Sequence, residues 1–279
     1  MAPDELAEGR PQRLRLILHA GFHKTGTTTV QRCLQDNQPL LSPHLRIFLR
    51  NDMLALCEAA RRWSATRNPV DFALFQFECA VLLEALDADD PRPVLLASED
   101  LSGHMPGRHG LKDYGAAPLL MKCIQDTVLE LQPAASICIF YMTRSAPEWL
   151  QSCHVQHLRA SPLTLDAEEY VRQYAASADL QAIVSGTAQL SASAKISSAP
   201  LEAASAHRLG PISALLPHLG LPAAAIEAMK PVPPANTRPE PEILEELLAL
   251  NRSGQPYSQI RIKKQAVLRR SRVSKRPPV

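Results

Sequence analysis

The sequence has 279 residues, of which 46% are hydrophobic, so it is long enough and apolar enough to bury one sizeable core. The formal net charge at pH 7 is only +2, and the composition excludes a fibrous or wholly disordered chain. No apolar run approaches the ~20 residues that span a bilayer. The polar first twelve residues lack the basic start and apolar stretch of a secretory signal. We therefore expect a soluble, cytoplasmic protein with no membrane span.

Short apolar runs alternate with stretches of helical spacing along the chain. In chain order, the expected elements are a strand at 14–19, a turn at 20–26, helices at 27–37, 53–63 and 70–88, a strand at 94–97, a loop at 103–110, a helix at 118–131, a strand at 136–142, helices at 145–157 and 166–174, a strand near 194–198, and helices at 211–219 and 240–250. Strands separated by helices predict an α/β fold with a central parallel sheet flanked by helices in three layers.

Charge is unevenly distributed along the sequence. The segment from Tyr257 to the C-terminus holds eight of the 30 basic residues and none of the 28 acidic ones, which leaves the rest of the chain mildly acidic. We expect a disordered N-terminus (1–12), one domain (13–252) and a basic, flexible C-terminal tail (253–279).

Six cysteines are scattered through the sequence without a C-x-x-C pair or the spacing of a zinc site. Several lie inside apolar runs, which favours buried free thiols in a reducing compartment. We therefore expect no metal centre.

Polar clusters follow three of the expected strands, at 23–29, at 98–100 and at Arg144. In open parallel sheets, ligands bind beyond the carboxyl ends of the strands. We therefore expect the three clusters to converge on a single site.

The segment 21–29 (GFHKTGTTT) follows a strand and opens a helix. Backbone N–H groups at a helix N-terminus bind anions, and here two glycines, the Lys24 ammonium and three threonine hydroxyls could assist them. The glycines have the spacing of a Walker A loop, but Thr27 stands where that motif has lysine, and Lys24 lies two residues before Gly26. The segment predicts a cradle for a phosphate-like group.

The position of Lys24 resembles that of a lysine in the phosphate-binding loop of a known family. Residues 23–29 resemble the 5′-phosphosulfate loop of the sulfotransferases that use 3′-phosphoadenosine 5′-phosphosulfate (PAPS), whose core reads Lys-[Ser/Thr]-Gly-Thr-Thr, and residues 21–28 match a form carried by bacterial-type members. That family also places an arginine at a strand end and a serine eight residues later on the 3′-phosphate, as Arg144 and Ser152 are spaced here. The donor-binding residues implied by the resemblance are His23, Lys24, Thr25, Gly26, Thr27, Thr28, Thr29, Arg144 and Ser152.

The resemblance covers roughly residues 14–158 and implies a single P-loop-containing domain that moves the sulfuryl group of PAPS to a hydroxyl or amine without a metal. Lys24 is expected to stabilise the leaving phosphate. Glu99, at a strand end, is the preferred catalytic base, and His104 is the second candidate. Asp100 is expected to cap the chain locally, and His23 to orient the loop.

This sequence departs from the family pattern in the residues that bind the 3′-phosphate. Many animal members hold it with an Arg-Lys-Gly loop near the C-terminus, which this sequence lacks. The region of Arg269 and Arg270 is the only substitute that the sequence offers there, and it is a weak one.

Three other functions stay open. A P-loop kinase or NTPase is suggested by the strand 94–97 followed by acidic residues, which resembles a Walker B strand, but the missing lysine argues against it. A non-catalytic nucleotide-binding module would keep the loop without transfer. Nucleic-acid binding by the basic tail is disfavoured, because the tail lacks interleaved aromatic residues. The acceptor (a small molecule, lipid or carbohydrate) and the oligomeric state are not readable from the sequence.

Overall fold

The computed structural model describes residues 13–87, 89–233 and 239–273. Its centre is a parallel sheet of five strands in the order β2-β3-β1-β4-β5. The strands are β1 (Arg15–His19), β2 (Arg46–Leu49), β3 (Val94–Ala97), β4 (Ser136–Thr143) and β5 (Lys195–Pro200). The α/β fold expected from the sequence is confirmed.

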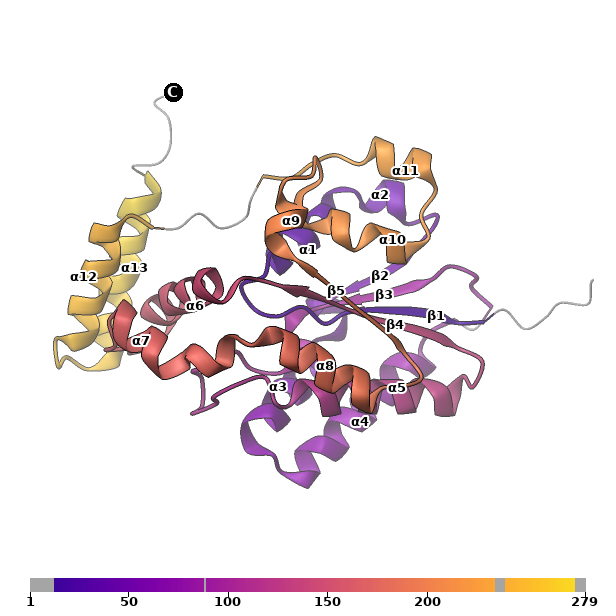
Figure 1. Cartoon of the computed structure of the whole chain (residues 1–279), viewed down its shortest axis with the longest axis horizontal. Helices are drawn as coiled ribbons and strands as arrows, with labels where there is room; N and C mark the ends of the chain where they lie inside the picture. The colour runs from indigo at the N-terminus through magenta and orange to yellow at the C-terminus, as the bar shows by residue number, and fades with distance from the viewer. Residues whose placement is uncertain (1–12, 88, 234–238, 274–279) are drawn as a thin grey trace, which may run out of the picture.

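Helices cover both faces of the sheet (Figure 1). One face carries α1 (Thr27–Asp36), α2 (Gln38–Leu41), α9 (Leu201–Ser205), α10 (Leu216–Leu219) and α11 (Ala223–Ala228). The other carries α3 (Leu54–Thr66), α4 (Pro69–Glu84), α5 (Ala117–Leu131) and α8 (Leu180–Leu190). Because successive strand side chains point to opposite faces, Ile17 packs into the first core, whereas Leu16 and Leu18 pack into the second.

The strand content differs from the prediction in one respect. The strands expected at 14–19, 94–97 and 136–142 are confirmed as β1, β3 and β4, and the one expected near 194–198 is β5. The short edge strand β2 was not predicted. Its four side chains are all half-buried, so it shows neither the alternation of a half-exposed strand nor a long apolar run.

The expectation of a flexible tail is wrong for most of its length. Residues 257–273 form α13 (Tyr257–Val273), which pairs with α12 (Pro241–Arg252), and this hairpin packs beside α6 (Ala146–Ala160) at one end of the molecule (Figure 1). Ile260, Lys264 and Val267 are buried because they share the face of α13 that meets its neighbours. Lys264 Nζ donates to the carbonyl of Ser161 at 2.7 Å.

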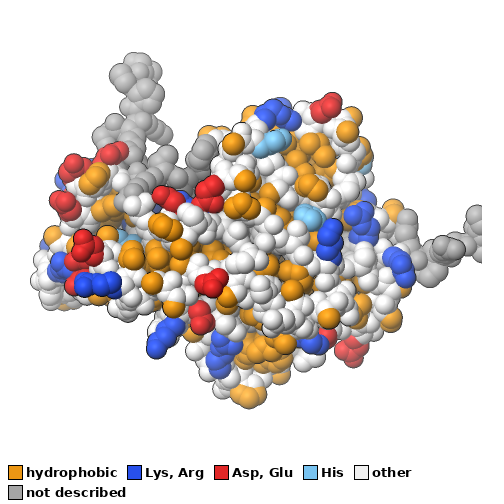
Figure 2. Space-filling model, in the orientation of Figure 1, with side chains coloured by type: hydrophobic (Ala, Val, Ile, Leu, Met, Phe, Trp, Pro, Cys, Tyr) orange, Lys and Arg blue, Asp and Glu red, His pale blue; other side chains and the backbone are white. Residues whose placement is uncertain are grey.

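Opposite charges on α12 offset part of the basic charge of α13. Figure 2 shows acidic side chains on this hairpin, and Arg270 of α13 pairs with Glu246 of α12 at 2.6 Å. Packing of its apolar face and this ion pair explain why the basic segment 257–273 forms a helix. The expected disorder of 1–12 and the last six residues of the tail lie outside the described residues, and the described helices include none long and apolar enough to cross a membrane.

Candidate active site

The carboxyl ends of β1, β3 and β4 open on a cavity of about 830 Å³. Its lining includes ten of the eleven site residues predicted from the sequence, all except Thr25. The three polar clusters therefore do converge, because parallel strands bring their carboxyl ends to one edge of the sheet.

The β1–α1 loop has a tightly constrained backbone. Gly26 has φ +88°, and a Cβ there would come within 2.8 Å of Leu201. Lys24 has φ +69°, a left-handed conformation that is uncommon for a residue other than glycine. The fully buried Thr25 side chain donates to the Phe22 carbonyl at 2.7 Å. Thr25 thus shapes the loop from beneath, and only its backbone could reach a ligand.

The first turn of α1 faces the cavity. Its ladder of hydrogen bonds begins with the N–H groups of Thr29 and Val30, which both donate to the Gly26 carbonyl. The preceding N–H groups of Thr27 and Thr28 belong to the turn in which a helix leaves its donors without intrahelical acceptors. These groups and the positive end of the helix dipole suit an anion.

Arg144, which follows β4, lies against the loop. Its Nη1 donates to the Lys24 carbonyl at 3.1 Å, and its Nη2 pairs with Glu148 at 3.2 Å. Lys24 Nζ donates to Gln156 Oε1 at 2.6 Å, and burial lowers the pKa of this ammonium. Gln156 was not predicted, although it lies one helical turn after Ser152 on the same face of α6, a spacing that could have revealed it.

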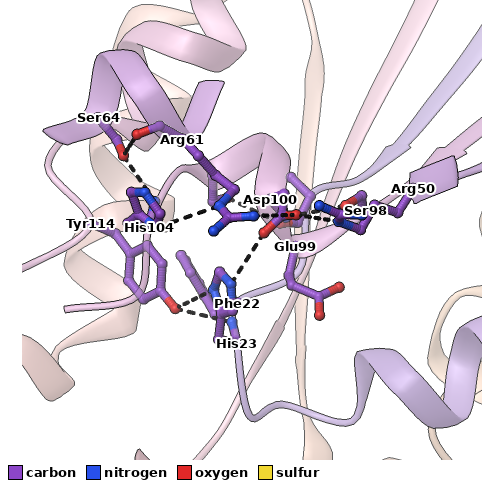
Figure 3. Close-up of polar contacts among 12 residues, drawn as sticks. Phe22, His23, Arg50, Arg61, Ser64, Ser98, Glu99, Asp100, His104 and Tyr114 are labelled. Atoms are coloured by element: carbon purple, nitrogen blue, oxygen red, sulfur yellow. Dashed lines mark hydrogen bonds and ion pairs between the residues drawn. The ribbon is translucent and has the colours of Figure 1, made fainter. Parts of the chain in front are cut away.

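Asp100 joins three positively charged or protonatable side chains (Figure 3). Its carboxylate accepts from Arg50 Nε at 2.7 Å and lies 3.4 Å from His23 Nε2 and 3.7 Å from Arg61 Nη1. Burial tends to raise the pKa of Asp100, but hydrogen bonds from His23 and Arg50 outweigh it and lower the pKa to about 2. The expected local capping role is wrong, because Ser98 caps this turn by accepting from the Asp100 N–H.

His23 is held from three sides. The Tyr114 hydroxyl lies 3.0 Å from both the backbone nitrogen and Nδ1 of His23, and Trp149 Nε1 donates to the His23 carbonyl at 2.9 Å. Because the hydroxyl accepts from the backbone N–H, it can donate its own proton to Nδ1, and Nε2 then faces Asp100. His23 therefore connects the β1–α1 loop to Tyr114, in the segment before α5, and to Asp100.

The two candidate bases differ in their surroundings. The half-buried Glu99 accepts from Gln31 at 2.9 Å through Oε2, and Figure 3 shows its carboxylate pointing away from Asp100. His104 is 9% exposed, and its Nδ1 accepts from Arg61 Nε at 3.4 Å. Burial, and then the charge of Arg61, lower the pKa of His104 to about 4. The Nδ1 lone pair of His104 is therefore engaged by a cation, so the ring offers only Nε2 as a base, whereas the Glu99 carboxylate has a second oxygen besides the one that accepts from Gln31.

The C-terminal arginines do not replace the missing Arg-Lys-Gly loop. Neither Arg269 nor Arg270 is part of the cavity lining, and Arg270 is paired on the α12–α13 hairpin. Arg208 does line the cavity, but its guanidinium donates to the carbonyls of three residues at the end of α11, which are Ile226, Glu227 and Met229.

Within the described part of the chain, no group of three or more His, Cys, Asp or Glu side chains is arranged to hold a metal ion. The acid that a Walker B strand would offer to magnesium is Asp100, whose carboxylate is occupied by Arg50. The Asp100 carboxylate is therefore already part of an ion pair in this structure.

Comparison with known proteins gives little beyond the fold. No family model matches the chain, and no curated protein matches it. Among solved structures, one match is a sulfotransferase from Alicyclobacillus acidocaldarius, with 17% sequence identity, a TM-score of 0.40, and coverage of 88% of this chain and 92% of that chain. At that identity and TM-score, the function must be argued from the site geometry.

Proposed function

We propose that this protein is a PAPS-dependent sulfotransferase that transfers a sulfuryl group to a hydroxyl or amine and releases adenosine 3′,5′-bisphosphate. The observation that supports it most is the contact between Arg144 and the Lys24 carbonyl, at 3.1 Å, on a cavity that Ser152 and Glu99 also line. The residues proposed to bind the two anionic groups and to act as the base therefore line one cavity, whose volume of about 830 Å³ lies within the range of ligand pockets.

The proposed donor site has two ends. The first turn of α1 and Lys24 would hold the 5′-phosphosulfate, through backbone N–H groups and one ammonium. Arg144 and Ser152 would hold the 3′-phosphate, for which the Arg144 guanidinium is a charge-assisted hydrogen-bond donor. A 3′-phosphate contact is what separates a PAPS site from an ATP site.

The bound donor supplies the sulfuryl group. Glu99 takes the proton from the acceptor as the bond between the acceptor atom and sulfur forms and the bond from sulfur to the phosphate oxygen breaks. Lys24 stabilises the negative charge that develops on that phosphate oxygen. Gln156 holds the ammonium in the cavity, so little reorganisation is needed when this charge appears.

Calorimetry without added metal tests the proposal. We expect adenosine 3′,5′-bisphosphate to bind at least tenfold more tightly than ATP. Lys24→Ala should weaken that binding by roughly tenfold or more, the loss of one charge-assisted hydrogen bond. Lys122→Ala is the matched control, because this lysine pairs with Asp126 on the surface of α5 and does not line the cavity. Equal or tighter binding of ATP would contradict the proposal.

A further inference from the structure

The cavity extends to both sides of the β1–α1 loop. In the sheet order, β4 and β5 lie on one side of β1, whereas β3 and β2 lie on the other. The proposed 3′-phosphate contacts follow β4. The opposite end is lined by Glu99 after β3, Arg50 after β2 and Arg61 from α3, and Arg108, from the loop before α5, lines the cavity close enough to His104 for its charge to lower the pKa of that ring. If the proposed function holds, an acceptor that reaches Glu99 must enter this β2–β3 end.

Among the residues that line the cavity at the β2–β3 end, three arginines face the two carboxylates of Glu99 and Asp100, and Glu58 acts on Arg50 from outside that lining. Asp100 is engaged closely by Arg50, at 2.7 Å, whereas its contact with Arg61 is 3.7 Å long. The remaining contact of Arg61 is with the ring of His104, which carries no negative charge. Among the described residues, no side chain pairs with the guanidinium of Arg108. Two arginines that line one end of the cavity are therefore left without a close carboxylate.

The electrostatic effect of these arginines reaches their neighbours. Burial is the main cause that lowers the pKa of His104, and the charges of Arg61 and Arg108 lower it further. Burial likewise lowers the pKa of Lys24, and Arg108 is among the charges that add to this effect. Such a cavity attracts anions, and a guanidinium binds an oxyanion through paired hydrogen bonds. It repels a cationic group by the same field.

We propose that the acceptor carries a carboxylate, phosphate or sulfate group near its reactive hydroxyl or amine, and that Arg61 and Arg108 bind this group. The proposal rests on the proposed function for the identity of the reaction, and on the two arginines without a close carboxylate for the class of acceptor. Selection works in two directions, because an uncharged acceptor gives these arginines no anionic partner and a cationic acceptor is repelled by them.

Matched acceptors that differ in one charged group provide the test. The aromatic series is 4-hydroxyphenylacetate, its amide and tyramine, and the sugar series is glucuronate, glucose and glucosamine. Binding to protein saturated with adenosine 3′,5′-bisphosphate and transfer from PAPS are both measured for each series. The variants are Arg61→Gln and Arg108→Gln. Arg62→Gln is the control, because Arg62 lies on the same helix but is 66% exposed and pairs with Asp71.

We expect the anionic member of at least one series to bind more tightly than its uncharged partner, and to have the higher kcat/KM wherever transfer occurs. Arg108→Gln should reduce this preference by roughly 10- to 100-fold through KM, the range for a lost charged hydrogen bond, and Arg62→Gln should leave it unchanged. If neither series shows preferential binding of the anion, or if both cavity variants retain the preference, the inference is wrong. Failure of adenosine 3′,5′-bisphosphate to bind at all would instead overturn the proposed function.

Discussion

Replacing Asp100 by asparagine tests the electrostatic framework of the site. The substitution keeps the size of the side chain but removes the charge that faces Arg50, Arg61 and His23. The pKa of Asp100 falls from an ordinary value of 3.8 to about 2, and at about 1.4 kcal/mol for each pH unit this corresponds to roughly 2 kcal/mol of stability. The arginines keep some contact with solvent, so we expect Asp100→Asn to cost about 2 kcal/mol and not the 3–5 kcal/mol of a fully buried broken pair.

Urea unfolding at pH 7, followed by tryptophan fluorescence, measures this loss. Asp126→Asn is the control, because Asp126 forms an exposed pair with Lys122 and should contribute only about 0.5 kcal/mol. A pKa lowered in the folded state means that the stability is present above the unfolded value near 3.9 and is lost as the pH falls toward 2. The difference between wild type and Asp100→Asn should therefore shrink as the pH falls from 4 toward 2. A cost for Asp100→Asn no larger than that for Asp126→Asn would refute the reasoning.

Three further predictions concern substitutions of single residues. Glu99→Gln should reduce transfer by roughly 10²- to 10⁴-fold in a PAPS assay with little change in affinity for adenosine 3′,5′-bisphosphate, whereas His104→Gln should reduce it less than tenfold; the reverse order would make His104 the base. Gly26→Ala should destabilise the protein by at least about 1 kcal/mol in urea, because φ is +88° and the new Cβ would meet Leu201; an unchanged midpoint would contradict this. Burial lowers the pKa of Lys264 to about 8 from 10.5, so wild-type stability should rise relative to Lys264→Met by about 1–2 kcal/mol between pH 8 and 10.5, less than the full shift because solvent screens part of the charge; parallel pH profiles would exclude it.

Local sequence signals were enough to predict the centre of the sheet and the loop beside it. The strand, turn and helix of residues 14–36 lie consecutively in the chain, so apolar pattern and glycine positions define them without knowledge of distant contacts. Placement of the predicted clusters on one cavity followed from the shared direction of the strands.

Features that depend on long-range packing were not predictable. The role of Asp100 comes from Arg50, which follows the unpredicted strand β2 and lies 50 residues away in the chain. The fold of α13 depends on packing of Val267 against Leu158 of α6 and Leu247 of α12, and charge composition alone suggested a flexible segment. In both cases residues distant in the sequence decide the outcome.

A crystal structure with adenosine 3′,5′-bisphosphate bound tests the central claim most directly. We predict the 5′-phosphate on the first turn of α1 beside Lys24, and the 3′-phosphate against Arg144 and Ser152. A nucleotide bound outside this cavity, or one whose 3′-phosphate lies away from both Arg144 and Ser152, would contradict the account.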